Sequence, residues 1–535
     1  MKRWIIGSVL LISVCFITLA SIHAYDNGKS LISKIRLFST IFERIRQDYV
    51  EETSGQTLIE SAIRGMVSDL DPHTSYLTSD HFKRWNQNYE GYSGIGVSFD
   101  IIDEKINILS VFKDGPSDRV GIIPGDRIVS IDGISSVGIK RDEVPLKLMG
   151  PKGTRVKVSI ERPGWKDLQD YTIVRDEVHL ESIPYAFMIR PGVGYINIVR
   201  FSATTGKELN TALNRLEKNG MRALVLDLRN NGGGYLDAAV EVCDQFLPSG
   251  KRIVYTKGRV DGSFREFFAT DRATHPLAPV VVLINRISAS ASEIVAGCLQ
   301  DWDRGLILGE TSFGKGLVQS QYRFPDGSAL LMTTARYYTP SGRLIQRAYD
   351  DKSLEQYYKE ISDDSLRKEW EVDPDRPSFQ TWLLHRKVLG GGGITPDIFL
   401  KSKSDTMTTI MRKLTYSPDR LFFTFSQKLV SNNPGLGEQD FNDFLKSYRP
   451  DSMTLQAFVK YARKSNFKIS NKEVIENKRD IQFVLKQFIA SKLWGQEASY
   501  KVQMLRDRQL LEAIEYVDEA RQLLARAYPN TDMGE

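Results

Sequence analysis

The chain has 535 residues, which is enough for three to five domains of ordinary size and excludes a single small fold. Its hydrophobic fraction of 41% and charged fraction of 26% are those of a globular protein and exclude a disordered or fibrous one. The 72 basic and 67 acidic residues leave a net charge of only +5, which gives no indication of nucleic-acid binding. Six scattered histidines lack zinc-ligand spacing, and three cysteines, with Cys15 in the first apolar run, allow at most one disulfide in the body of the chain.

The N-terminus has the pattern of an export signal. Lys2 and Arg3 precede an uncharged run of 19 residues, 4–22, and such a basic flank stays in the cytoplasm while the rest is sent outward. The run is longer than the core of most cleaved signals and close to the ~20 residues of a membrane-spanning helix. We therefore expect an exported, periplasmic protein whose residues 1–24 are either removed or kept as an inner-membrane anchor.

The first part of the mature chain changes character near residue 89. Residues 31–82 carry apolar side chains at spacings of mostly three and four, which predicts helices. Residues 89–174 instead show short apolar alternations divided by glycine, which predicts strands and turns. We place an N-terminal helical segment at 25–88 and a strand-rich domain at 89–176.

From residue 194 onward, strand-like and helix-like segments alternate, a pattern typical of a layered α/β core. We assign this core to residues 177–400, with a polar, helix-compatible insertion at 349–389. Beyond it only helical spacing remains, so residues 401–535 are predicted to form a helical accessory domain. The expected strands are 195–201, 223–228, 280–284 and 306–308, and the expected helices are 206–218, 236–246 and 291–300.

The most informative segment is S-A-S-A-S-E at 288–293, which follows a buried-strand pattern and opens an amphipathic helix. A serine hydroxyl there lies beside exposed helix amides and the positive end of the helix dipole, which stabilise an oxyanion. This placement suits a nucleophile. The alternative is that Ser288 only caps the helix and that the serines and alanines allow close packing.

A serine nucleophile needs a base, and the sequence has neither a catalytic G-x-S-x-G motif nor a nearby histidine. Lys315 lies between two glycines on the loop after the next strand, and a desolvated lysine can lose its proton and act as a base. Taken alone, such a lysine is usually a surface residue. The segment 227–234 runs from a buried strand into a glycine turn, whose amides can approach a substrate carbonyl, although a turn without a ligand has the same pattern.

Together these segments resemble the C-terminal processing (tail-specific) serine peptidases, over about residues 41–400. The resemblance implies a crotonase/Clp-protease-like peptidase core with an inserted PDZ domain at 89–176. By the family's spacing, Ser290 is the nucleophile, Lys315 lies 25 residues later, and Gln319 orients the lysine. The remaining site residues would be Ser288 and Asp301 in support, and Gly233 and Ala291 as oxyanion-hole amides. Because relatives often have proline at position 232, which glycine of 232–234 donates stays open.

In the implied PDZ domain, Gly94, Ile95, Gly96 and Val97 correspond to the loop that binds a terminal carboxylate. Such domains add the C-terminal end of a peptide as a strand and place an apolar side chain in a pocket. The resemblance therefore implies an exported endopeptidase, without cofactor or metal, acting on proteins with accessible apolar C-terminal tails. The alternative is a noncatalytic PDZ scaffold on an inactive protease fold, which the intact Ser290 and Lys315 disfavour. The oligomeric state stays open, as do the roles of the insertion and the accessory domain.

Overall fold

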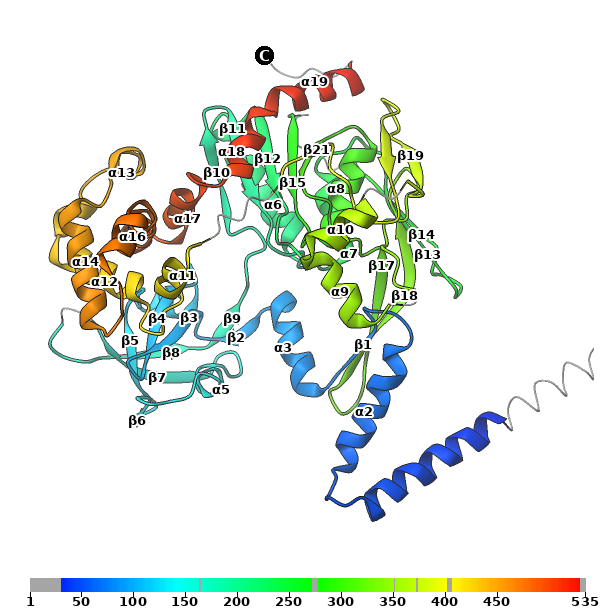
Figure 1. Cartoon of the computed structure of the whole chain (residues 1–535), viewed down its shortest axis with the longest axis horizontal. Coiled ribbons are helices and arrows are strands. Elements are labelled where there is room, and N and C mark those ends of the chain that lie inside the picture. Colours follow the sequence, from blue (N-terminus) through cyan, green and yellow to red (C-terminus); the bar gives the residue numbers. More distant parts are fainter. Residues whose placement is uncertain are drawn as a thin grey trace, which may run out of the picture. The chain divides into compact units, whose positions relative to one another are not determined.

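The computed structural model describes residues 30–162, 165–271, 278–350, 352–371, 374–401 and 407–529 (Figure 1). The predicted signal or anchor, 1–24, lies outside these residues. Within the described part, none of the helices is both long and apolar enough to cross a bilayer. The chain divides into two compact units, which are Met1–Thr78 with Gln321–Met332, and Ser79–Ser320 with Thr333–Glu535.

The first unit contains helical residues 30–48, helix α2 (Gly55–Ser68) and strand β1 (Ser75–Leu77). Strand β1 pairs antiparallel with the first residues of β18 (Ala329–Tyr338). The Asp71 carboxylate accepts hydrogen bonds from the Thr74 main chain at 2.8 Å and hydroxyl at 2.6 Å, which closes the turn into β1. The continuous helical pattern expected over 31–82 is thus interrupted by a turn and a short strand.

The centre of the second unit is a six-stranded sheet in the order β10-β11-β12-β15-β16-β21. Only the β10–β11 pair is antiparallel. The strands are β10 (Tyr185–Arg190), β11 (Val193–Asn197), β12 (Ala223–Asp227), β15 (Val280–Ile284), β16 (Leu306–Gly309) and β21 (Ile398–Phe399). Their connecting helices α6 (Thr205–Lys218), α7 (Leu236–Asp244) and α8 (Ala291–Asp301) agree closely with the segments expected from the sequence.

Both faces of this sheet are buried, as is usual for parallel strands. Leu224 and Leu226 of β12 pack in the cluster that contains α6, α7 and α8. Val225, between them, packs in a second cluster with Leu510 of α18 (Arg508–Glu515) and Leu523 of α19 (Val517–Ala527). The last two helices, red in Figure 1, therefore form the second helical layer of the peptidase core.

The insertion contains two helices and a hairpin. Helices α9 (Leu354–Ser362) and α10 (Asp364–Glu371) occupy its first half, where the polar periodicity predicts helices. Strands β19 (Ser378–Gln380) and β20 (Lys387–Leu389) form an antiparallel hairpin that the sequence did not predict. The sequence also did not predict strands β13 (Arg252–Gly258), β14 (Arg265–Phe268) and β17 (Leu317–Arg323), or β18.

The strand-rich domain has its own sheet, in the order β3-β4-β5-β7-β8, and its own apolar core around Ile106, Ile128 and Val158. Helix α3 (Ser79–Glu90) precedes it, and strand β2 pairs with β9 at its two ends. The elements are β2 (Tyr92–Gly94), β3 (Val97–Ile102), β4 (Lys105–Val111), α4 (Pro116–Arg119), β5 (Arg127–Ile131), β6 (Ile134–Ser135), α5 (Glu143–Leu148), β7 (Arg155–Glu161), β8 (Gln169–Val174) and β9 (Asp176–Val178).

The accessory region is helical, as expected, and its core is aromatic. Phe422 stacks on Phe458 with ring centroids 4.8 Å apart, and Phe444 packs against Trp494 at 4.8 Å. The elements before α18 are α11 (Thr409–Thr415), α12 (Leu421–Asn432), the short 3-10 helix Pro434–Gly437, α13 (Phe441–Ser447), α14 (Ser452–Lys464), α15 (Asn471–Glu476), α16 (Lys478–Trp494) and α17 (Gln496–Met504).

Candidate active site

The three sequence segments singled out above follow neighbouring parallel strands. Residues 228–235 follow β12, residues 285–290 follow β15 and residues 310–316 follow β16. Because the carboxyl ends of parallel strands lie at one edge of a sheet, the three loops meet there. This explains how residues almost 90 positions apart come together.

Ser290 is the N-cap residue of α8 and has a strained main chain. Its φ of 56° and ψ of −113° lie in a region that non-glycine residues rarely occupy. The next residue, Ala291, has an N–H that finds no acceptor within the described residues. The serine side chain therefore stands at a helix end with an unused amide next to it, the arrangement that stabilises a developing oxyanion.

The glycine turn lies against this serine. Gly233 has a φ of 100°, and a Cβ atom at this position would lie 2.8 Å from the Cβ of Ser290 and 3.1 Å from the nitrogen of Ala291. Only glycine fits this approach. The Gly233 N–H itself donates to Asn231 Oδ1 at 2.8 Å, whereas the exposed Gly232 has no acceptor for its N–H in the described part of the chain. Oxyanion binding by Gly233 therefore requires its bond to Asn231 to be shared or broken.

Lys315 and Gln319 are in direct contact. The lysine Nζ donates to the Gln319 Oε1 at 2.6 Å, and both side chains are half-buried. Lys315 lies in the loop before β17, and Gln319 is the third residue of that strand. The orienting role that the resemblance implies for the glutamine stays a prediction, and this contact is compatible with it.

Glu293 joins the serine and lysine loops, a role that the sequence did not reveal. Its Oε2 accepts the main-chain N–H of Ser290 at 2.8 Å and that of Lys315 at 2.9 Å. Its Oε1 accepts the N–H of Gly314 at 2.7 Å and the hydroxyl of Ser312 at 2.5 Å. Complete burial raises the pKa of Glu293 to about 7, although these hydrogen bonds act in the opposite direction.

Tyr337, from β18, makes a second connection between the same loops. Its hydroxyl is within hydrogen-bond distance of the carbonyl oxygens of Ser290, at 3.1 Å, and of Lys315, at 2.5 Å. Burial raises the pKa of this phenol well above its ordinary value, so the group remains a donor. No local sequence pattern identifies this tyrosine, because its partners are 22 and 47 residues away.

The two outer serines of the motif bind the main chain of the neighbouring loop. Ser288 Oγ donates to the carbonyl oxygen of Leu228 at 2.8 Å, and Ser292 Oγ donates to that of Asn231 at 2.9 Å. Both serines are fully buried. They fix the glycine turn beside Ser290, which is a structural role.

Asp301 is at the other end of α8. Its carboxylate forms an ion pair with Arg343 and accepts the N–H of Ser341 at 2.9 Å, and neither charged side chain is exposed. The acid therefore binds the turn at 339–343.

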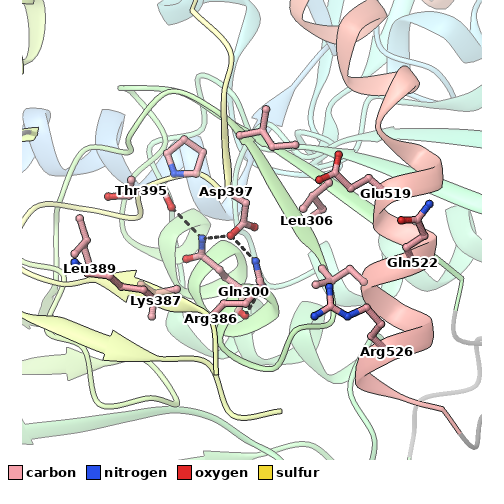
Figure 2. A pocket seen from close by; sticks show the side chains of 14 residues that line it. Gln300, Leu306, Arg386, Lys387, Leu389, Thr395, Asp397, Glu519, Gln522 and Arg526 are labelled. Atoms are coloured by element: carbon pink, nitrogen blue, oxygen red, sulfur yellow. Dashed lines mark hydrogen bonds and ion pairs between the residues drawn. The ribbon is translucent and has the colours of Figure 1, made fainter. Parts of the chain in front are cut away.

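The end of α8 is also bound to the segment that follows the insertion. Figure 2 shows Gln300 donating to the Thr395 carbonyl and to Asp397, each at 3.0 Å, while Arg386 donates to Asp397 at 2.6 Å. Burial raises the pKa of Asp397, and Arg386 opposes this shift. These residues line a cavity of about 590 Å³ beside α19. The contacts anchor the helix that carries Ser290 at its other end.

In the strand-rich domain, the segment 94–97 has the features expected of a carboxylate loop. Gly96 has a φ of 73°, and its carbonyl and that of Ile95 accept main-chain hydrogen bonds at 3.0 Å. Among the described residues, the N–H groups of Ile95 and Gly96 have no acceptor. Gly94 and Val97 end β2 and begin β3, so all four residues lie where the chain passes between two strands.

Four family models match the chain. Residues 192–351 match peptidase family S41, residues 108–162 match the PDZ domain, and residues 19–81 match the N-terminal domain of the activating protease CtpB. Residues 419–495, in the accessory region, match a family of unknown function, DUF8443.

The chain is 37% identical over 340 residues to the carboxy-terminal-processing protease of Bartonella bacilliformis, covering 63% of this chain and 78% of that protein. It is 34% identical over 330 residues to the carboxy-terminal processing protease CtpA of Bacillus subtilis, covering 61% and 70%. A solved structure, the photosystem II D1 C-terminal processing protease, is 26% identical, with a TM-score of 0.33 over 68% of this chain and 92% of that one.

The α/β core, the strand-rich domain, the family models and the two curated relatives define a serine-type peptidase with a PDZ domain. The chain belongs to the carboxy-terminal processing proteases of peptidase family S41. The resemblance and the fold class predicted from the sequence are thereby confirmed, whereas the predicted domain boundaries and the roles of individual site residues stay predictions.

Proposed function

We propose that this protein is an exported endopeptidase in which Ser290 is the nucleophile and Lys315 the general base, and that it acts on proteins through accessible apolar C-terminal tails. The main support is that Glu293 and Tyr337 each bind the main chains of both residues. A proton transfer between the two side chains requires that their loops be held in a fixed position relative to each other.

In the first half of the proposed reaction, Ser290 Oγ attacks the scissile carbonyl carbon while the neutral Lys315 amine takes the hydroxyl proton. The tetrahedral oxyanion is stabilised by the Ala291 N–H and by an amide of the glycine turn. The C–N bond then breaks, and the Lys315 ammonium returns its proton to the leaving amine. An ester on Ser290 remains.

In the second half, Lys315 takes a proton from a water molecule that attacks this ester. The new tetrahedral intermediate collapses, the ester bond breaks, and Ser290 recovers a proton from the lysine. Throughout, Gln319 holds the amine through its side-chain oxygen, at 2.6 Å. No cofactor enters any step.

We assign selection of the substrate to the PDZ domain. The unused N–H groups of Ile95 and Gly96 suit the terminal carboxylate of a peptide that pairs with the domain as an added strand. An amidated peptide cannot offer this carboxylate, so a free apolar C-terminus is expected to bind more tightly than its amide.

Export is supported by the basic start and apolar run of residues 1–24. Cell fractionation followed by N-terminal sequencing tests it. A periplasmic protein beginning near residue 25 indicates a cleaved signal, and a membrane-bound full chain indicates an anchor. Recovery in the cytoplasm contradicts export.

The activity is tested by comparing protein C-termini in cells that express the parent enzyme or the Ser290→Ala variant. New C-termini that depend on Ser290 are expected. A purified parent protein that binds apolar C-terminal peptides without cleaving them, under conditions where it is folded, would instead support the noncatalytic PDZ scaffold.

A further inference from the structure

The accessory domain has a groove that is remote in sequence from every catalytic residue. It lies at helices α14 and α15, within the segment that matches a family of unknown function, and has a volume of about 830 Å³. Leu455 and Val459, both less than 10% exposed, form apolar lining from α14. Val474 and Ile475 line it from α15, and Ile475 is 75% exposed. The groove therefore presents an apolar surface to solvent.

The charged residues that line this groove all have one sign. Four of its eleven lining residues are cationic and none is acidic. The four are Lys460, Arg463, Lys464 and Lys478. The segment 452–478 carries six basic and two acidic side chains, a net charge of +4, whereas the whole chain of 535 residues has a net charge of +5. The segment that forms the groove is therefore basic.

These cations differ in how they are held. Arg463 donates to the Ile469 carbonyl at 3.0 and 3.2 Å and to Asn471 at 2.8 Å, which fixes its guanidinium at the groove. Lys460, Lys464 and Lys478 are exposed and form no ion pair with any residue that the structure describes. Their ammonium groups are thus open to an external anionic partner.

We propose that this groove binds an acidic polypeptide segment that also carries apolar side chains. Carboxylates pair with the lysines, and the apolar side chains cover Ile475 and the lining below it. A concave surface can enclose side chains in this way but cannot follow a flat bilayer. The lining contains no aromatic residue on which nucleic-acid bases could stack, so a single-stranded nucleic acid fits less well.

This site extends the proposed function without depending on it, because no catalytic or PDZ residue lines the groove. A protein partner bound here is held by a segment other than its C-terminus. The PDZ domain, by contrast, needs a terminal carboxylate. The two sites are therefore separable by a peptide that has no free carboxyl end.

The test uses the full chain with Ser290→Ala, so that the probe is not cleaved. The probe is a fluorescent 12-residue peptide of alternating glutamate and leucine or valine, acetylated and amidated, and its binding is followed by anisotropy. Lys460→Glu with Lys464→Glu is expected to weaken binding about tenfold or more, since two attractions become repulsions. The matched control, Lys446→Glu with Lys218→Glu, changes the net charge equally at exposed positions that do not line the groove, and is expected to leave binding within about twofold.

Two further measurements test whether the peptide uses both the apolar lining and the positive charge of the groove. Ile475→Ser is expected to weaken binding about threefold, because it removes exposed apolar contact without disturbing the core. The same peptide with lysine in place of glutamate is expected not to bind. Equal losses in the two double variants, or equal binding of the acidic and basic peptides, overturn the proposal.

Binding to anionic lipid vesicles but not to the acidic peptide also overturns it, in favour of a membrane surface. Circular dichroism melts of each variant exclude unfolding as a cause. Cleavage of a short apolar peptide by otherwise active protein carrying Lys460→Glu and Lys464→Glu is expected to equal that of the parent. If the parent protein itself does not cleave peptides, the proposed protease function is contradicted, but the proposed binding of acidic segments in the groove is not.

Discussion

Asp507, in the turn before α18, accepts hydrogen bonds from both terminal nitrogens of Arg229, at 3.0 and 2.6 Å. Arg229 also pairs with Asp227 at 2.6 Å, and all three side chains are largely buried. Asp227 ends β12, and the glycine turn beside Ser290 begins a few residues later. A residue of the accessory region thus completes the charge network at the base of a catalytic loop.

We predict that Asp507→Ala lowers both the stability of the protein and its rate of peptide hydrolysis. Its removal leaves Arg229 with one carboxylate in a buried site and removes the cap of α18, so the free energy of unfolding is expected to fall by about 2 kcal/mol. The value of kcat/KM should fall about tenfold as the glycine turn loosens. Urea unfolding and peptide hydrolysis measure the two effects. Asp518→Ala, at an exposed ion pair of α19, is the control, and equal losses in both variants would show that the Arg229 contact has no special importance.

The second prediction concerns the ionisation of Glu293. Because burial raises its pKa from 4.5 to about 7, the folded protein binds a proton more readily than the unfolded chain. The contribution of Glu293 to the free energy of unfolding is complete below about pH 4.5 and is lost as the pH rises through 7. The full difference is on the order of 3 kcal/mol. Glu293→Gln cannot titrate, so the unfolding free energies of variant and parent should converge or cross over this pH range.

The same variant is expected to lose about a hundredfold or more in kcat, because an amide N–H₂ now faces N–H donors of the Ser290 and Lys315 loops. Denaturant unfolding at pH 4.5 to 8 and peptide hydrolysis check the two effects. Glu512→Gln, at an exposed position of α18, is the matched control. The role assigned to the carboxylate is contradicted if the unfolding free energy of Glu293→Gln depends on pH as that of the parent does. It is also contradicted if the kcat of the variant equals that of the parent.

The third prediction tests the base. Lys315→Arg and Lys315→Ala are both expected to be inactive, because a guanidinium stays protonated and an alanine has no amine. Gln319→Ala should lower the rate without abolishing it, since it only orients the amine. Hydrolysis is measured against a Ser290→Ala preparation that reveals contaminating protease. A Lys315→Arg enzyme with turnover near that of the parent excludes a lysine base.

The fourth prediction compares two glycines with positive φ. Gly233→Ala is expected to reduce kcat at least a hundredfold, because the new Cβ would press on Ser290 at a φ of 100°. Gly250→Ala has a comparable strain, with a φ of 77°, but open space around the new atom. It should cost about 1 kcal/mol of stability and leave hydrolysis unchanged. If both variants keep full activity, close contact at the glycine turn is not needed for catalysis.

The sequence predicts the central layer of the fold well, because β15 is an unbroken apolar run of strand length and the largely apolar segment of α8 follows it after a short loop. It does not predict the β19–β20 hairpin, whose strands have three residues each and bury only one side chain, that of Val388. For the accessory helices it predicts an apolar face but not the surface that this face covers. That α18 and α19 pack on the peptidase sheet depends on contacts between residues hundreds of positions apart.

The same limit applies to the site. Ser290, Lys315 and Gln319 are recognisable because their spacing is fixed along the chain. Glu293 and Tyr337 act through hydrogen bonds to main-chain groups of distant loops, and such bonds leave no mark on composition or periodicity. A local hint existed for Glu293, since it is three residues after the N-cap of α8, where a glutamate commonly accepts the N-cap amide.

The packing of α18 and α19 on the central sheet also sets the order in which the enzyme can mature during synthesis. Five of the six strands, β10 to β16, are made by residue 309, yet the apolar face that includes Val225 and Val281 is covered only when residues 508–527 have emerged. A partly synthesised chain that stops before residue 508 therefore still exposes one apolar face of its peptidase sheet. The peptidase core is thus completed only when residues 508–527 have been made, long after the loops that carry Ser290 and Lys315.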